Sequence, residues 1–360
     1  MKLVAPIHAP NEVDALVDAG ADELYCGLLE PWWQERYGTH DSINRRQKGA
    51  SLASREELAR LVARADARGA PVYLTVNMRY TEPQLGYLVE LCADFEQMGG
   101  TGLQIADIGL LSRLKDAQLS LRLCLSLLAV ADNIPTIELY RKRLGVDRVV
   151  LPRFVTEQEA AALLAPFAGL EAEGMAFFDK CPFVDGYCRA YHGVAYRERH
   201  DGEAPAEGLE PLTSFDTTFT THACLKGEQR YLQSHPCAAC YLARYEDAGV
   251  GFAKIGGRGR PLEDRLAALC FLRAALQLRS DAERVQLYEQ SFNQPCQCYC
   301  GTARQQRTAI PPTQSRLPED CRWLAFGASP GRARRVYVGS ETERHTLEQL
   351  LAARDWLAAL

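Results

Sequence analysis

The sequence predicts an α/β protein in which strands and helices alternate and the strands close into a parallel barrel. Short apolar runs rich in β-branched and aromatic residues recur between residues 1 and 260, and segments with apolar residues at helical spacing separate them. This alternation calls for a parallel sheet, because a helix carries the chain back to begin each next strand. The repeats are short and regular, which favours a closed TIM-type (β/α) barrel over an open doubly wound sheet.

The first elements are the clearest. LVAPI at 3–7 is an apolar strand, and Asn11 is the expected N-cap of the helix that follows it. ELYCGL at 23–28 is the second strand, and a loop rich in aromatic and charged residues comes after it. A helix is expected at 55–68. PVYLTVN at 71–77 is typical of a buried strand, because it is rich in β-branched and aromatic residues.

The same alternation continues through the next five units. The further predicted strands are 102–107, 121–127, 148–151, 175–178 and 251–255, and the further predicted helices are 82–98, 110–115, 133–143, 156–164 and 240–249. No GxGxxG motif follows the first strand, so the sequence does not support a dinucleotide site.

The character of the chain changes after residue 260. A long amphipathic pattern at 261–292 predicts a helix that breaks near Ser280. A cysteine-rich loop and a proline-rich loop follow, and then two short strands at 323–326 and 336–338 and a terminal helix from about residue 341. We therefore expect a barrel domain at 1–260 and a C-terminal α+β extension at 261–360 that packs on it.

Composition narrows the class of protein. The 360 residues are 47% hydrophobic and carry a formal net charge of −5, which is ordinary for a soluble globular protein and disfavours extensive binding to RNA. The basic stretches at 43–48 and 254–261 would allow a local nucleic-acid groove. The chain lacks the basic start of a signal peptide and any apolar run long enough to span a membrane, so we expect a cytoplasmic location.

Cysteine usage points to a metal centre. Five of the 13 cysteines lie between residues 181 and 240, among glycine, proline, histidine and aromatic residues. Loops of this kind can bring several thiolates to one point, as iron–sulfur and zinc sites require. The Cys237-x2-Cys240 pair also fits a structural zinc site. Three cysteines on alternate residues form a possible second or shared site: Cys296, Cys298 and Cys300.

Four further cysteines divide into two groups. Cys26 ends a predicted strand at the barrel rim and is expected to face the barrel cavity. Cys92, Cys124 and Cys270 lie in apolar patterns and are expected in the core.

Several segments together resemble the collagenase-like peptidase family U32. These are LVAPIHAPNEVDALVDAGADELYCG, INRRQKGASLASREELARLV, PVYLTVN, LGVDRVVLPR, the Cys181-x6-Cys188 pair and CAACYLARYEDAGVGFAKIGGRGRP. The resemblance covers residues 3–261. It implies an incomplete or distorted TIM-type barrel that carries a [4Fe–4S] cluster on four cysteines. It also implies oxygen-independent hydroxylation, which family members carry out on ubiquinone precursors or on tRNA and rRNA bases.

The resemblance also assigns residues. Cys181 and Cys188 match the first two cluster ligands, and Cys237 matches the cysteine that precedes the signature lysine. Cys224 is the remaining candidate, with Cys240 competing for one of the last two places. Four basic residues are implied near the barrel mouth, where they would hold a carboxylate or phosphate of the substrate: Arg45, Arg46, Lys254 and Arg258.

Three departures from the family pattern qualify this assignment. Gly256 stands where the signature has glutamate, Phe177–Phe178 replace a His–Gly pair, and Phe154 replaces the glutamate of an Arg–Glu pair. The expected function is nevertheless an iron–sulfur-dependent hydroxylation, or a related modification, of a small aromatic acid or quinone precursor.

Three alternatives remain open: modification of tRNA or rRNA bases, a non-catalytic cluster-bearing subunit in a heterodimer with a paralogous U32 chain, and a peptidase. The sequence contains no HExxH or GxSxG motif, which disfavours the peptidase.

Overall fold

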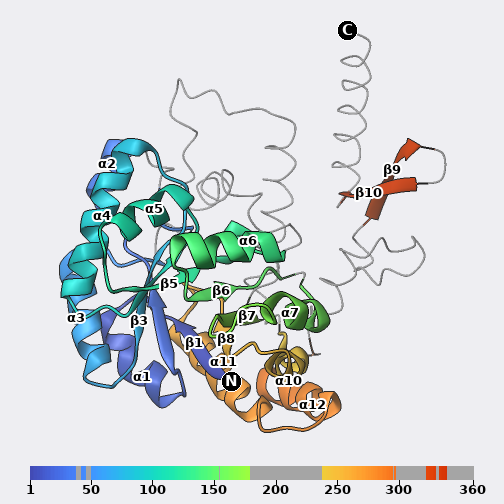
Figure 1. Ribbon diagram of the computed structural model, residues 1–360. Coiled ribbons are helices and arrows are strands. Elements are labelled where there is room, and N and C mark those ends of the chain that lie inside the picture. Colours follow the sequence, from blue (N-terminus) through green and yellow to red (C-terminus); the bar gives the residue numbers. More distant parts are fainter. Residues whose placement is uncertain are drawn as a thin grey trace.

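Eight parallel strands form a closed barrel with helices around it (Figure 1). The computed structural model describes residues 1–37, 42–45, 50–153, 155–178, 237–294 and 296, and the backbone of 322–329 and 332–338. The barrel strands are β1 (Lys2–Pro6), β2 (Glu23–Cys26), β3 (Val72–Val76), β4 (Gly102–Ile105), β5 (Arg122–Leu125), β6 (Arg148–Val150), β7 (Glu171–Phe177) and β8 (Phe252–Ile255).

The strands follow one another in chain order, and β8 pairs with β1 to complete the circle. The predicted TIM-type barrel is therefore confirmed. The family resemblance implied an incomplete or distorted barrel, but the circle of strands is complete. Its one irregularity is a shift in the pairing of β7 with β8, between Met175 and Phe177.

The helices occupy the expected segments except for α2, which forms where a loop was predicted after the second strand. They are α1 (Val13–Asp18), α2 (Pro31–Tyr37), α3 (Arg55–Asp66), α4 (Glu82–Gln97), α5 (Ile108–Asp116), α6 (Ile134–Glu138), α7 (Glu157–Leu164), α10 (Ala239–Asp247), α11 (Leu262–Ala275) and α12 (Asp281–Phe292). Short helical turns lie at Pro10–Glu12, Leu127–Ala129 and Leu139–Arg143. No helix within the described part of the chain is long and apolar enough to cross a membrane.

Capping explains where several helices begin. Ser280 and Glu283 form a capping box at the start of α12, so the long C-terminal pattern divides into two helices near Ser280, as predicted. Asn11, however, is not an N-cap. It lies inside the short turn Pro10–Glu12, which precedes α1 and has proline in its first turn.

The C-terminal part is described only in pieces. α11 packs against β1 and β8, and α12 packs against α10 and α11. β9 (Arg322–Ser329) and β10 (Arg332–Val338) form the two predicted strands as an antiparallel pair. The predicted terminal helix from about residue 341 lies outside the described residues.

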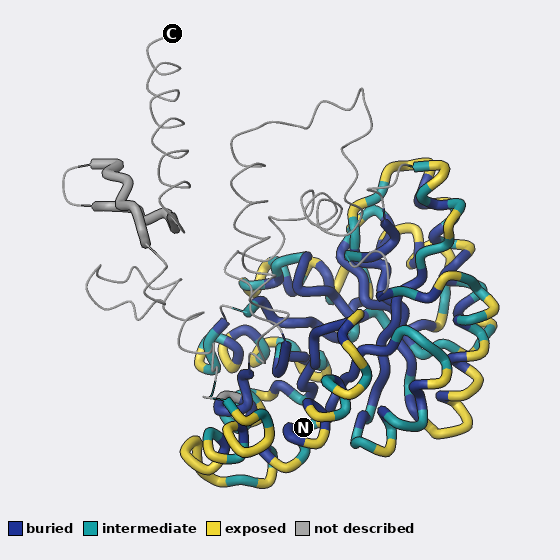
Figure 2. The backbone as a smooth tube through the Cα atoms, turned by 180° about the vertical axis from the view of Figure 1, so that it is seen from behind, coloured by how far each residue is buried: buried dark blue, intermediate teal, exposed yellow. Residues whose placement is uncertain are grey.

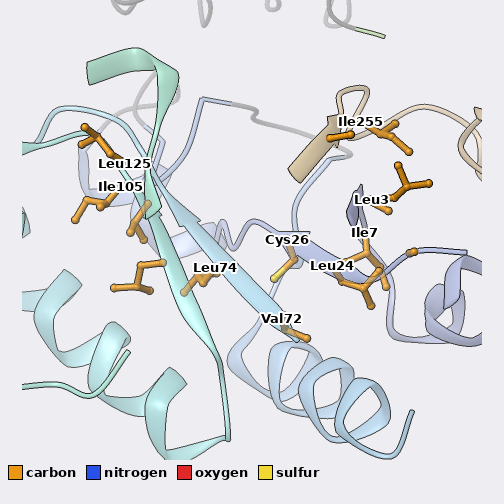
Figure 3. Close-up of a cluster of buried hydrophobic side chains, with 14 of the residues drawn as sticks. Leu3, Ile7, Leu24, Cys26, Val72, Leu74, Ile105, Leu125 and Ile255 are labelled. Atoms are coloured by element: carbon orange, nitrogen blue, oxygen red, sulfur yellow. The ribbon is translucent and has the colours of Figure 1, made fainter. Parts of the chain in front are cut away.

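The larger of the two cores lies between the barrel strands and the helices around them. Figure 2 shows the barrel strands as the buried centre of the molecule. Figure 3 shows Cys26 among the apolar side chains of this core, together with Leu24 and Leu74. Successive strand residues point to opposite faces, so Tyr25 points into the barrel and Cys26 points out of it. The expectation that Cys26 faces the cavity is therefore wrong.

The cysteines predicted in the core differ in outcome. Cys92 and Cys124 are buried, Cys92 in the outer core and Cys124 inside the barrel. Cys270 is exposed on α11, so its assignment to the core is wrong.

The inside of the barrel is charged as well as apolar. Arg148 of β6 is buried, and its guanidinium donates to both carboxylate oxygens of Glu23 at 2.6 and 3.0 Å. It also donates to Glu171 at 2.9 Å and to Glu173 at 3.3 Å. These contacts join β2, β6 and β7 inside the barrel near the amino-terminal ends of the strands. Arg148 thereby supplies the buried carboxylates with a counter-charge.

Candidate functional site

Polar and cationic side chains gather at the carboxyl ends of the strands, where the reactive groups of parallel barrels lie. Lys254, at the end of β8, is buried and points into the barrel. Its ammonium lies 2.7 Å from Glu173 and 4.0 Å from the centre of the Tyr25 ring. The Tyr25 hydroxyl donates to the carbonyl of Ile255 at 2.8 Å, which fixes the ring against β8. Lys254 therefore has a defined position between an anion and an aromatic face.

Arg258 lies beyond the end of β8 and is also buried. Its Nη2 donates to Oδ1 of Asn44 at 2.8 Å, and Asn44 is held by the carbonyl of Leu28 at 3.2 Å. Gly27 makes this contact possible, because a Cβ there would come within 2.3 Å of the Arg258 guanidinium and 2.7 Å of the Asn44 amide. Gly27, directly after β2, thus leaves room for the side chain of Arg258, which lies beyond the end of β8.

The rim continues along β3 to β5. The backbone N–H of Arg45 donates to Asn77 Oδ1 at 3.1 Å, and Asn77 Nδ2 donates to Ser126 Oγ at 3.1 Å. Lys254, Arg258 and Arg45 thus lie at the same end of the barrel. Arg46 lies outside the described residues.

The opposite wall of the mouth is apolar. Ala106, Leu127, Leu128 and Val150 belong to the cluster inside the barrel. Leu127 and Leu128 are carried by the short turn after β5, which ends at Val130 with a φ of 54°. A positive φ is unusual for a β-branched residue, and such strain is found mainly where the surrounding structure fixes a functional loop. The mouth thus combines a cationic side with an apolar side.

Cys237 lies beside the end of β7. Its backbone forms an isolated antiparallel β-bridge with Phe177, and the next residue, Ala238, donates its N–H to the carbonyl of Ala176 at 2.8 Å. Cys237 is 2% exposed, and its sulfur accepts the N–H of Ala239, at the start of α10, at 3.2 Å. A backbone N–H and the positive end of a helix both stabilise a thiolate.

The other candidate ligands are only partly described. Cys240 is buried in the first turn of α10. Cys296 is half-buried and packs at the edge of the outer core. Five predicted cysteines lie outside the described residues: Cys181, Cys188, Cys224, Cys298 and Cys300. Within the described ranges, no three His, Cys, Asp or Glu side chains come together as a metal site.

Two of the three departures from the family pattern meet in space. A Cβ at Gly256 would lie 2.8 Å from the carbonyl oxygen of Phe178, and the Gly256 N–H donates to the Phe177 carbonyl at 2.7 Å. Phe178 has a φ of 54°, a conformation that a glycine adopts without strain. Glycine at 256 and phenylalanine at 178 are therefore parts of one packing arrangement. The third departure, Phe154, lies outside the described residues.

Sequence reasoning did not identify Glu173, Asn44 or Asn77. His8 follows β1, with Nε2 3.5 Å from Glu12; burial, offset in part by Glu12, lowers its pKa, so the imidazole is neutral at pH 7. Glu173 precedes the apolar run at 175–178, and its side chain points to the opposite face of β7 from the outward-facing Ala172. That alternation was the signal that could have extended β7 toward Glu171.

Several solved structures resemble this chain. A U32 peptidase is 14% identical and aligns over 72% of this chain and 94% of its own, with a TM-score of 0.46. A 2,3-dimethylmalate lyase is 12% identical over 82% of this chain and 84% of its own, with a TM-score of 0.38. A tryptophan synthase from M. tuberculosis is 12% identical over 77% of this chain and 93% of its own, with a TM-score of 0.40.

The family comparison is more specific than these structural similarities. The model of peptidase family U32 matches residues 8–299, which run from just after β1 to the residue before Cys300. This range includes every barrel strand after β1, together with Cys237, Lys254 and Arg258. The chain belongs to peptidase family U32.

Proposed function

We propose that this protein carries a [4Fe–4S] cluster at the mouth of the barrel and takes part in oxygen-independent hydroxylation, or a related modification, of a small aromatic acid. The ligands would be Cys181, Cys188, Cys224 and Cys237. The observation that carries the proposal is the position of Cys237: a buried thiol at the end of a barrel strand, with a backbone N–H directed at its sulfur. Hydrogen bonds to sulfur are one of the means by which proteins tune such clusters.

The chain order supports a shared site. Cys181 follows Phe178 by three residues in the sequence, and Phe177 pairs with Cys237 at the end of β7. The stretch that contains two proposed ligands therefore begins where a third is held.

The mouth supports the substrate class. Lys254 and Arg258 would hold a carboxylate, because both are buried cations and charge-assisted hydrogen bonds are strong away from water. Leu127, Leu128 and Val150 would pack against an aromatic ring. A cationic side facing an apolar side suits an aromatic acid better than a nucleic-acid backbone, which an overall charge of −5 also disfavours.

A structural zinc site is the second candidate. Cys237, two residues before α10, and Cys240, in the first turn of α10, are both buried and have the spacing of a zinc knuckle. RNA modification, a non-catalytic role in a heterodimer and peptidase activity rest on the family resemblance alone.

The test compares two cysteine variants purified without oxygen. Cys237→Ser is expected to lose most of the iron and acid-labile sulfide. Cys270→Ser is the matched control, because Cys270 is exposed on α11 and should leave the iron content unchanged. Equal iron in both variants, or zinc in place of iron in the unaltered protein, would contradict the proposal.

A further inference from the structure

Two polar side chains inside the barrel each have an atom without a hydrogen-bond partner among the described residues. Thr75 on β3 is 2% exposed and Gln104 on β4 is 3% exposed. Within the described structure, Thr75 Oγ1 and Gln104 Nε2 are buried and have no hydrogen-bond partner. Buried polar groups are nearly always satisfied, so two neighbouring exceptions require an explanation.

Both side chains point into the barrel. Leu74 and Val76 flank Thr75 and lie in the outer core, and Leu103 and Ile105 do the same around Gln104. Because side chains alternate along a strand, Thr75 and Gln104 must face inward. The two residues are also direct partners in the β3–β4 ladder, so their side chains leave the sheet side by side.

Polar side chains near the pair, in contrast, have hydrogen-bond partners. At the next inward-facing position toward the mouth, Asn77 Nδ2 donates to Ser126 Oγ at 3.1 Å, so these two side chains are paired. Ala106, which follows β4 and lines the inside of the barrel, has a side chain of a single methyl group. Elsewhere in the interior, Lys254 and Glu173 bond to each other at 2.7 Å. The two partnerless atoms on β3 and β4 thus lie side by side, next to side chains that are paired.

We propose that Thr75 and Gln104 bind an oxygen of the small-molecule ligand. The amide Nε2 donates, and the threonine hydroxyl can donate or accept, so a ring hydroxyl would satisfy both. Such a group would lie on the ligand at a different position from the carboxylate that Lys254 and Arg258 hold. This inference rests on the proposed aromatic-acid site and adds to it a selection for an oxygenated ring.

The test measures binding of benzoate, 3-hydroxybenzoate and 4-hydroxybenzoate by titration calorimetry. At least one hydroxybenzoate is expected to bind about 10-fold more tightly than benzoate, as one hydrogen bond in a buried site would give. Thr75→Val and Gln104→Met should remove this preference and leave benzoate affinity within about 2-fold. Thr101→Val is the matched control, because Thr101 precedes β4 at the opposite end of the barrel and accepts the N–H of Val72.

A second measurement separates a ligand site from a trapped water. Without ligand, Thr75→Val and Gln104→Met should keep or raise the melting temperature, because they remove buried polar atoms that lack partners. A clear fall in melting temperature would show that an internal water satisfies these atoms, and would overturn the inference. Equal affinities for the three acids, or a preference that survives both substitutions, would also overturn it.

Failure of the cluster proposal would be seen separately. It appears as absent iron and sulfide, whereas this inference is tested by ligand selectivity and stability alone.

Discussion

Replacing Arg148 with methionine should destabilise the barrel strongly. The Arg148 side chain is 2% exposed and donates to Glu23, Glu171 and Glu173. Burial alone would lower the pKa of Arg148, but the hydrogen bond to Glu23 and the nearby carboxylates hold it above its ordinary value. Methionine keeps much of the volume and removes the charge, so the buried carboxylates lose their counter-charge.

The magnitude follows from the burial of the partners. Glu173 is fully buried and Glu23 is 4% exposed. Breaking a buried ion pair by removing one partner costs about 3–5 kcal/mol of unfolding free energy. For a domain of this size, each kcal/mol lowers the melting temperature by about 2–4 °C. We therefore expect a fall of roughly 10 °C at neutral pH.

The control is Arg113→Met. Arg113 forms an ion pair with Glu82 in which the two side chains are 56% and 71% exposed, so its loss should change the melting temperature little. Differential scanning calorimetry of both variants gives the comparison. Adding Glu23→Gln to Arg148→Met should recover part of the loss, because it removes one uncompensated charge. Similar melting temperatures for the Arg148 and Arg113 variants would refute this reasoning.

The same network predicts a pH dependence. Burial alone would raise the pKa of Glu171, but hydrogen bonding to Arg148 holds it below the ordinary value of 4.5. A lowered pKa stabilises the folded protein above pH 4.5, and this contribution is lost as the pH falls through the folded-state pKa. The difference between wild type and Arg148→Met should therefore narrow in acid. A difference that is constant from pH 7 to pH 3 would contradict the assignment.

Two further predictions concern packing and thiol reactivity. Gly256→Glu restores the family's signature residue and should lower the melting temperature, because its Cβ would lie 2.8 Å from the Phe178 carbonyl oxygen. Gly251→Ala is the control and should be tolerated, because a Cβ there meets nothing within 4 Å. Equal stability of the two variants would count against the packing argument. Burial raises the pKa of Cys26 to about 12, so iodoacetamide at pH 8 should leave Cys26 unmodified in the folded protein and label the exposed Cys270, as peptide mass spectrometry can show.

The strands and helices could be predicted because their apolar patterns are simple. PVYLTVN is nearly all buried in β3, and Ser280 marks the break before α12 through its capping box. The start of β7 was missed because Glu171 and Glu173 resemble surface residues. Their charges are tolerated in the barrel only because Arg148 and Lys254, from other strands, lie against them. Sequence spacing does not reveal such partners.

The site was predictable in outline but not in detail. The family resemblance and the positions of Lys254 and Arg258 at strand ends indicated the mouth, where both now lie. Asn44 could not be identified, because its role depends on Gly27 leaving room for Arg258. Cys26 was misplaced because a one-residue step along a strand exchanges the two faces of the sheet.

The proposed cluster is tested most directly by low-temperature EPR of the protein purified without oxygen and then reduced with dithionite, with metal analysis of the same sample. We expect iron and acid-labile sulfide in equal amounts and the signal of a reduced [4Fe–4S] cluster, lost in Cys237→Ser and kept in Cys270→Ser. Stoichiometric zinc with no cluster signal would contradict it and leave a structural metal site on the same barrel.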